Sequence, residues 1–278
     1  MALIPKRDDA KFILNDKMSE LELPRPYLGM SGIGQKCHRK LQYDHYWCYK
    51  IAHSARIKRL FQVGHDAEPK LVAEIEQLGY TFHSDQLEVT GTGGHWKGHI
   101  DGVFVKLQEL PHRDFSSHEY LAEFKTHNDK SFKDLKKLGV KKSKPLHFDQ
   151  CTSYSGYLNL EQSKYVAYNK NDSEIYVEDI PFDKERFKEL KSKEAEVIMA
   201  EVLLPKIGNG TSNWFECKMC DARATCHKGK LPPVTCRTCR WVDVLPDGIW
   251  ACSKTLSALT VDEQKEACGD YLLGDMFK

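Results

Sequence analysis

The distribution of cysteine is the feature that most restricts how this chain can fold. Ten cysteines occur in 278 residues, and seven of them lie between Cys217 and Cys268. After Leu204 the sequence is rich in glycine, proline and cysteine and lacks the apolar periodicity of helices and strands. Because such a segment cannot bury a sizeable core, we expect its cysteines to hold it together.

The rest of the sequence favours metal over disulfides. The amino-terminal sequence MALIPKRDDAKF has no apolar export signal, and no apolar run approaches the roughly 20 residues of a membrane span. We therefore expect a cytoplasmic protein, in a bacterial or phage-infected cell, with no membrane partner. The cytosol keeps thiols reduced, so metal binding is favoured, and disulfide pairing in an exported protein is the alternative.

The segment before Leu204 alternates between helical and strand patterns, which predicts an α/β domain. Apolar residues recur with the helical period over 58–79, where Gly79 supplies a stop, and residues 35–59 are also expected to be helical. We expect an antiparallel meander of three strands, with a long loop before the third, and then a helix, two strands and a last helix. The expected ranges are 80–89, 95–107 and 120–127 for the meander, then 145–160, 164–170, 173–180 and 183–204.

Two of the expected strands carry an acidic pair and a lysine. Asp101 lies in GHIDGVFV, and Glu123 and Lys125 lie in EYLAEFKTH. Side chains alternate along a strand, so Glu123 and Lys125 share one face while Phe124 points into the core. Two carboxylates suit a hard divalent cation, and the lysine would reach a water or a phosphate. The alternative is a solvated strand face, on which such triplets are common.

Two helices carry further candidates. His65 lies in FQVGHDAE, one turn before Glu68, which could bind a metal through water. Gln150 and Tyr154, in FDQCTSYSGY, are spaced i and i+4 and share one helical face.

In this order the motifs resemble those of the PD-(D/E)xK nuclease superfamily, in particular the RecB-like exonuclease branch with its AddB-type, CRISPR-associated and phage-encoded members. The resemblance covers roughly residues 30–226, with Ile100 where the family has proline. It implies a restriction-endonuclease-like core, a mixed central sheet flanked by helices. His65, Asp101 and Glu123 would bind Mg²⁺ or Mn²⁺, and Lys125 would position or activate water. Gln150 and Tyr154 would contact DNA or orient Lys125.

The same resemblance implies a [4Fe–4S] cluster. Relatives hold one through a cysteine before the nuclease core and three cysteines after it. The matching residues here are Cys37, Cys217, Cys220 and Cys226. The cluster would be a structural staple that joins distant chain segments.

Four further cysteines fit a zinc site. They are Cys236, Cys239, Cys252 and Cys268. A different grouping stays open, because Cys217/Cys220 and Cys236/Cys239 also have the C-x2-C spacing pair of an ordinary zinc site. Cys48 and Cys151 are expected to be ordinary thiols.

DNA would have to bind to a local basic patch, since 41 basic and 40 acidic side chains nearly cancel. A run of lysines follows the strand of Lys125. These lysines could contact DNA phosphates, or they could simply form a solvated face. Tyr43, Tyr46 and Trp47 could stack on bases or could belong to the core. The candidate DNA-binding residues are Arg39, Lys40, Lys130, Lys133, Lys136, Lys137, Lys141 and Lys142, with Lys144, Arg56, Lys58 and Arg59 in the same regions.

The sequence thus predicts a metal-dependent DNA exonuclease that acts at DNA ends or on single strands, with recombination or replication proteins as partners. We expect an arm over 1–30, a nuclease core over 31–226 and a cysteine-rich zinc module over 227–278. The alternatives are a non-catalytic DNA-binding adaptor with a nuclease fold, and a nuclease that acts on RNA or in CRISPR adaptation.

Overall fold

The computed structural model describes residues 21–83, 87–109 and 115–278. Its longer helices are α2 (His38–His45), α3 (Ala55–Glu76), α4 (Asp129–Ser143), α5 (Pro145–Leu158) and α6 (Lys184–Met199). Three short helices follow, α7 (Phe215–Lys218), α8 (Arg223–Lys228) and α9 (Val261–Lys265). The strands are β1 (Leu28–Gly29), β2 (Thr81–His83), β3 (Glu88–Thr90), β4 (Trp96–His99), β5 (Gly102–Glu109), β6 (Phe115–His127), β7 (Gln162–Asn169), β8 (Ile175–Pro181), β9 (Val242–Val244), β10 (Trp250–Cys252) and β11 (Ser257–Ala258).

A mixed five-stranded sheet with the order β2-β5-β6-β7-β8 forms the centre of the molecule. Strands β6 and β7 are parallel, and the other neighbours are antiparallel. The described residues also form two three-stranded sheets, β1-β4-β3 and β11-β10-β9. The expected α/β class with a mixed sheet and flanking helices is confirmed at this level.

The expected three-stranded meander is wrong in its pairing. The range 95–107 forms two strands, β4 and β5, which belong to different sheets and are separated by Ile100 and Asp101. The range 80–89 likewise divides into β2 and β3. Both ranges have strand-like sequences, and such a pattern does not reveal a change of partner strand.

The expected long loop between Asp101 and Glu123 is also wrong. Strands β5 and β6 pair from Gly102 opposite Ala122 to Glu109 opposite Phe115, which makes a long hairpin. Its outer part carries exposed side chains such as Leu107, so backbone pairing rather than core burial extends it.

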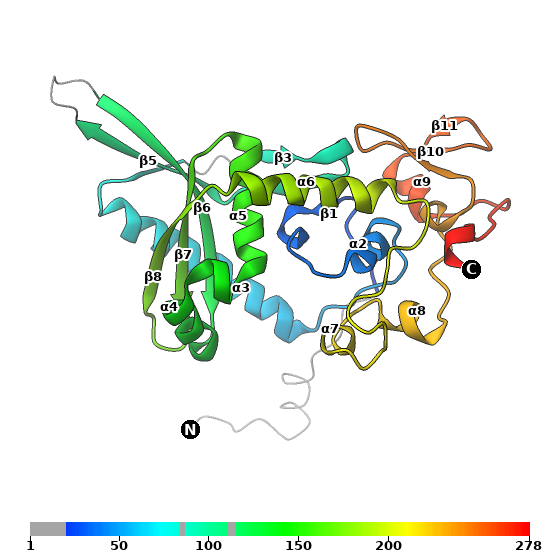
Figure 1. Ribbon diagram of the computed structural model, residues 1–278, viewed down its shortest axis with the longest axis horizontal. Helices are drawn as coiled ribbons and strands as arrows, with labels where there is room; N and C mark the ends of the chain where they lie inside the picture. Colours follow the sequence, from blue (N-terminus) through cyan, green and yellow to red (C-terminus); the bar gives the residue numbers. More distant parts are fainter. Residues whose placement is uncertain (1–20, 84–86, 110–114) are drawn as a thin grey trace, which may run out of the picture.

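Helices cover both faces of the five-stranded sheet (Figure 1). On one face, Leu71 and Ile75 of α3 pack against Phe104, Phe124 and Val166. On the other face, α4 and α5 contribute Phe132, Leu135 and Phe148 to a cluster that includes Tyr165 of β7. The buried Phe124 therefore confirms the expected direction of the side chains on β6.

Helix α3 begins and ends at residues that favour helix ends. The side chain of Ser54 accepts a hydrogen bond from the Ile57 amide at the start of α3, and Gly79 beyond its end has a φ of 83°. The helix predicted for 35–59 is interrupted, because α2 ends at His45 and α3 begins at Ala55. Trp47, with a φ of 54°, turns the chain between them and is buried.

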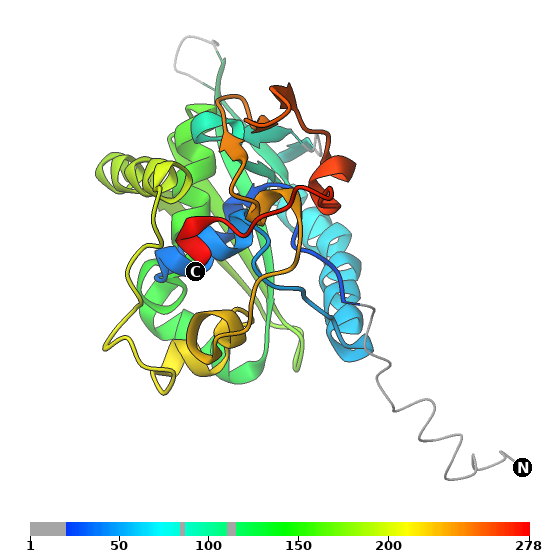
Figure 2. The same ribbon diagram turned by 90° about the vertical axis from the view of Figure 1, so that its right-hand side faces the viewer.

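The cysteine-rich segments lie at the end of the molecule away from the five-stranded sheet (Figure 1). Tyr43 of α2 and Tyr46, which follows it, form a hydrophobic cluster with Ala222, in the segment of α7 and α8, and Trp250, in the segment of β9–β11. After a quarter turn, α8 and β9–β11 still lie apart from each other (Figure 2). Helix α2 thus packs against both segments. None of the helices within the described ranges is long and apolar enough to cross a membrane.

The predicted arm lies partly outside the described residues, which begin at residue 21. Its last part is ordered against the core. Glu22 bridges to Ile51, and β1 pairs in parallel with β4.

Candidate active site

Asp101 occupies the point where the chain passes from β4 to β5. Its Oδ2 accepts a hydrogen bond from the backbone amide of Phe124 at 2.8 Å. This bond fixes the carboxylate against β6, beside Glu123.

Glu123 and Lys125 point to the same side of β6, as predicted. The Glu123 side chain is 1% exposed and Lys125 is 26% exposed, and Glu123 Oε1 forms an ion pair with Lys125 Nζ. Glu123 Oε2 accepts a hydrogen bond from Gln150 Nε2 at 3.0 Å. The carboxylate is therefore held from two sides, by β6 and by α5.

Burial dominates the electrostatics of this group. It raises the pKa of Glu123 to about 7, with help from the charges of Asp101 and Glu68 and against the charge of Lys125. Burial lowers the pKa of Lys125, but the charges of Glu123 and Asp101 outweigh it and leave that pKa raised. The site therefore concentrates negative charge around one lysine.

Helix α3 supplies the other wall of the site. His65 is exposed and Glu68 is half-buried. Burial and the charge of Asp101 raise the pKa of Glu68, while His65 and Lys125 lower it. A cleft of about 450 Å³ is bordered by α3 and the strands, and the residues that line it are Leu60, Phe61, Gly64, His65, Glu68, Leu71, Asp101, Phe124, Lys125 and Thr126.

Gln150 and Tyr154 of α5 form hydrogen bonds that hold the acidic residues of the site in place. Gln150 bonds Glu123, and Tyr154 Oη donates to the carbonyl of His99 at 3.1 Å, two residues before Asp101. Both side chains are buried, with Tyr154 only 2% exposed. Glycine is required where β4 passes this tyrosine, because a Cβ on Gly98 would overlap Tyr154 Oη. Gln150 thus positions the Glu123 carboxylate directly, and Tyr154 positions Asp101 through the backbone of the preceding strand.

The sequence reading missed a buried network beside Lys125. His127 Nε2 and His147 Nδ1 lie 2.9 Å and 2.7 Å from Tyr165 Oη, and His127 Nδ1 lies 3.1 Å from Ser131 Oγ. Burial is the largest cause that lowers the pKa of His127 to about 4 and of His147 to about 3. The period of two along EFKTH places His127 on the face of Lys125, a signal that could have found it.

The donor set around Asp101 fits a hard divalent cation. Glu123 Oε1 has no polar partner other than Lys125 among the described residues, and Asp101 and Glu68 add carboxylate oxygens nearby. As the side chains stand within residues 21–83, 87–109 and 115–278, no group of three or more His, Cys, Asp or Glu residues is close enough together to hold a metal ion.

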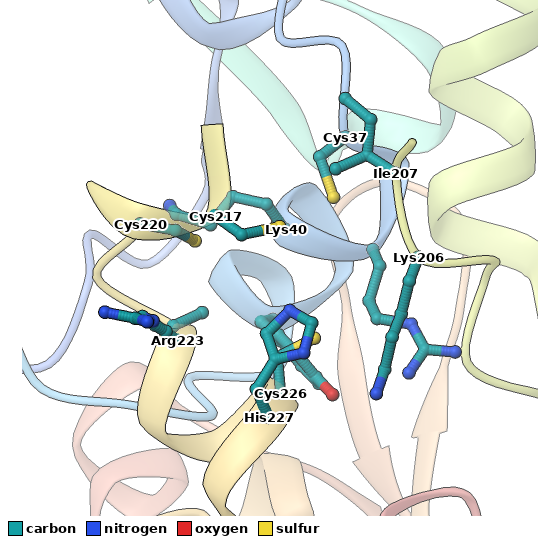
Figure 3. Close-up of a pocket in the computed structure, with 12 residues that line it drawn as sticks. Cys37, Lys40, Lys206, Ile207, Cys217, Cys220, Arg223, Cys226 and His227 are labelled. Atoms are coloured by element: carbon teal, nitrogen blue, oxygen red, sulfur yellow. The ribbon is translucent and has the colours of Figure 1, made fainter. Parts of the chain in front are cut away.

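The four cysteines predicted to hold an iron–sulfur cluster line one pocket (Figure 3). Cys37 precedes α2, Cys217 lies in α7, Cys220 follows α7, and Cys226 lies in α8. The pocket is separate from the Asp101 cleft and shares no lining residue with it.

The other predicted set, Cys236, Cys239, Cys252 and Cys268, lines a second pocket. Cys48 and Cys151 are buried and line neither of the two pockets.

The predicted DNA-binding residues lie in two places. Arg39 and Lys40 line the first cysteine pocket, where Arg39 bonds the carbonyls of Leu203 and Leu204 and Lys40 pairs with Asp44. The lysines of α4 lie on exposed surface, and three of them form ion pairs, Lys133 with Asp129, Lys136 with Glu174 and Lys141 with Asp183. Lys130, Lys137, Lys142 and Lys144 belong to α4 and its end.

The aromatic residues offered as base-stacking platforms are core residues. Tyr43, Tyr46 and Trp47 are 4%, 7% and 1% exposed. Their stacking role is therefore wrong, and the alternative reading is confirmed.

No family model and no curated protein sequence matches this chain. Three solved structures show a weak likeness. The alkaline exonuclease LHK-Exo from Laribacter hongkongensis is 14% identical, with a TM-score of 0.44 over 62% of this chain and 86% of that chain. The same enzyme in complex with dAMP is 15% identical, with a TM-score of 0.42 over 62% and 88%. The protein SSO0001 is 14% identical, with a TM-score of 0.37 over 78% of this chain and 91% of that chain.

Proposed function

We propose that this protein is a metal-dependent nuclease that hydrolyses phosphodiester bonds in DNA. One observation carries the proposal. A buried carboxylate, Glu123, is paired with Lys125 and lies beside Asp101, and both Lys125 and Asp101 line an open cleft. Burying a carboxylate beside a second carboxylate, with one lysine to offset their charges, is costly unless a bound cation offsets the rest.

Asp101 and Glu123 would hold Mg²⁺ or Mn²⁺, with His65 completing the set from α3 and Glu68 acting through water. The bound ion would polarise the phosphate and lower the pKa of a water molecule. Lys125 extends from the same face of β6 into the cleft, where its ammonium would position the attacking water or neutralise a phosphate oxygen. Gln150 would hold the Glu123 carboxylate in position, and Tyr154 would hold the backbone that carries Asp101.

We propose DNA ends or single strands as the substrate and an exonuclease as the activity, in recombination, replication or repair. The phosphate contacts would come from three lysines of α4 that form no ion pair with an acid among the described residues, Lys130, Lys137 and Lys142. Such contacts predict binding that weakens steeply with salt.

We also propose that Cys37, Cys217, Cys220 and Cys226 hold a [4Fe–4S] cluster. Supporting this, four thiols from separate segments line one pocket, apart from the acidic cleft. The cluster would be structural, because its pocket holds none of the acidic residues of the proposed active site.

Replacing Asp101 with asparagine, or Lys125 with alanine, should reduce DNA cleavage on the order of 10²-fold or more, the usual loss for such a group. The measurement uses DNA labelled at the 5′ or 3′ end, single- and double-stranded, with Mg²⁺ and with Mn²⁺. The order of product lengths gives the polarity.

Asp172→Asn and Lys106→Ala are matched controls outside the cleft and should cleave like the unchanged protein. Full cleavage by either site variant would refute the assignment. DNA binding by the unchanged protein without products under every condition would favour the non-catalytic adaptor.

A further inference from the structure

The second group of four cysteines is brought together from parts of the chain that are distant in sequence. Cys236 and Cys239 flank a single 3₁₀ turn, Cys252 ends β10, and Cys268 follows α9. All four line one pocket, together with Trp241 and Tyr271. None of the first four cysteines lines it. The fold therefore favours one of the two groupings that spacing alone leaves open.

The environment of these thiols suits a metal that binds thiolates. Cys236, Cys239 and Cys252 are partly buried and Cys268 is exposed, so a metal ion can reach the four thiols from solvent. The Thr255 hydroxyl and the backbone of Thr255 and Lys254 lie within hydrogen-bond reach of the Cys252 sulfur. Donors aimed at sulfur are typical of the surroundings of a metal-bound thiolate.

The turn between Cys236 and Cys239 carries Arg237, which points away from the cysteines into the core. Arg237 is 1% exposed, and its guanidinium carbon lies 3.8 Å and 4.2 Å from the ring centroids of Trp47 and Trp250. It donates to the carbonyls of His45 at 2.8 Å and Pro26 at 2.6 Å. Its remaining bonds go to Gln264 Oε1.

This arginine therefore joins three parts of the chain. Its carbonyl partners belong to the segment before β1 and to the end of α2, and Gln264 belongs to α9. The guanidinium has no carboxylate partner among these contacts, so its burial depends on carbonyls and indole rings held in place. A turn that presents such a side chain needs a fixed backbone, which a metal bound to both flanking cysteines would provide.

A second contact links this segment to the strand that leads to Asp101. The amide of Gly248 donates to the carbonyl of Gly93 at 2.9 Å, and His95 Nε2 lies 2.7 Å from the carbonyl of Leu245. A Cβ on Gly94 would lie 2.7 Å from Asp247 Cα, so the two turns are in close backbone contact. The turn of residues 92–95 leads directly into β4.

We propose that Cys236, Cys239, Cys252 and Cys268 bind one zinc ion, and that this zinc fixes Arg237 and the turn of residues 245–248 against the core. Zinc suits a set of four thiolates without a redox role, and the four side chains would close around the ion when it binds. The inference stands on this geometry and does not depend on the proposed nuclease activity.

Metal analysis of purified variants tests the site. The unchanged protein should contain one zinc per chain, Cys268→Ser should lose it, and Cys217→Ser, in the other pocket, should keep it. Because Cys268 is exposed, its replacement by serine leaves the core packing unchanged. A zinc content in Cys268→Ser equal to that of the unchanged protein, complete loss of zinc in Cys217→Ser, or no zinc in the unchanged protein would each overturn the assignment.

Cobalt substitution gives an independent measurement. The unchanged protein loaded with Co²⁺ should show the intense visible bands of tetrahedral thiolate coordination, and Cys268→Ser should lose the part that belongs to this site. Bands of equal intensity in the two proteins would contradict the proposal.

Hydrogen exchange tests the coupling to the core. Removing zinc from the unchanged protein with a chelator should speed amide exchange on the order of tenfold in the turn of residues 92–95 and at the end of α2. Arg237→Ala should keep zinc and show the same faster exchange at the end of α2. Exchange that stays unchanged in both regions after zinc removal would refute the coupling.

Discussion

At the scale of single residues, the buried histidines beside Lys125 show how the core limits charge near the site. His127 is 7% exposed, and both of its ring nitrogens contact a hydroxyl, of Ser131 and of Tyr165. Burial and the charges of Lys144, Lys125 and Lys170 lower its pKa to about 4. A neutral ring there leaves Lys125 without a second buried cation nearby, which favours its pairing with Glu123.

This lowered pKa predicts how stability depends on pH. The unfolded chain takes up a proton on His127 below its ordinary pKa of 6.5, while the folded protein does not until about pH 4. The contribution of His127 to stability is therefore complete above pH 6.5 and is lost as the pH falls toward 4, by about 2 kcal/mol at pH 5.

Urea unfolding at pH 7.5 and pH 5 measures this effect. His127→Asn should lose less stability between the two pH values than the unchanged protein, by about 2 kcal/mol. Equal losses of stability between pH 7.5 and pH 5 in the two proteins would show that His127 does not control the pH dependence of stability.

At the scale of helices and strands, the sequence predicted elements better than their pairing. Residues 58–79, 145–160 and 183–204 were expected to be helical, and α3, α5 and α6 lie there. The division at Ile100 was not predicted, because the strand-like sequence GHIDGVFV does not reveal that β4 pairs with β3 while β5 pairs with β6. Helical spacing predicted that Gln150 and Tyr154 share a face, but only the folded backbone shows that Tyr154 bonds His99.

The close contact between Gly98 of β4 and Tyr154 of α5 gives a prediction at this scale. A methyl group on Gly98 would overlap Tyr154 Oη and lie 2.9 Å from Met30 Cβ, so Gly98→Ala must displace the tyrosine or the strand. We expect a loss of about 1–3 kcal/mol in stability, the usual cost of overpacking, and a fall in cleavage because Asp101 moves with β4. Urea unfolding and the end-labelled cleavage assay measure the two effects.

Gly64→Ala is the matched control for that substitution. Gly64 lies inside α3 with no atom within 4 Å of an added Cβ, so alanine should raise stability by about 0.5–1 kcal/mol. A Gly98→Ala protein as stable as the unchanged one would show that β4 and Tyr154 are not in tight contact.

At the scale of the whole molecule, α2 connects the cysteine-rich end to the rest of the chain. Cys37 lies at its amino-terminal end, and Tyr43 and Tyr46 pack against residues of both cysteine-rich segments. The sequence predicted the two sets of four cysteines, but it did not predict that both segments pack against this helix. That contact joins side chains about 180 positions apart in the chain, a separation over which periodicity carries no signal.

The first cysteine pocket gives the prediction for the whole chain. Protein purified without oxygen should be coloured and contain about four iron atoms per chain, and Cys37→Ser should lose both iron and colour while keeping zinc. Because Cys37 and Cys217 are 180 positions apart, losing the cluster opens a loop whose closure is worth about 4–5 kcal/mol in a chain-entropy account of cross-links. Thermal unfolding of Cys37→Ser should therefore begin at a clearly lower temperature.

The matched control is Cys48→Ala, which replaces a buried thiol outside the pocket and should keep its iron. A colourless unchanged protein with two zinc ions would show that both pockets hold zinc.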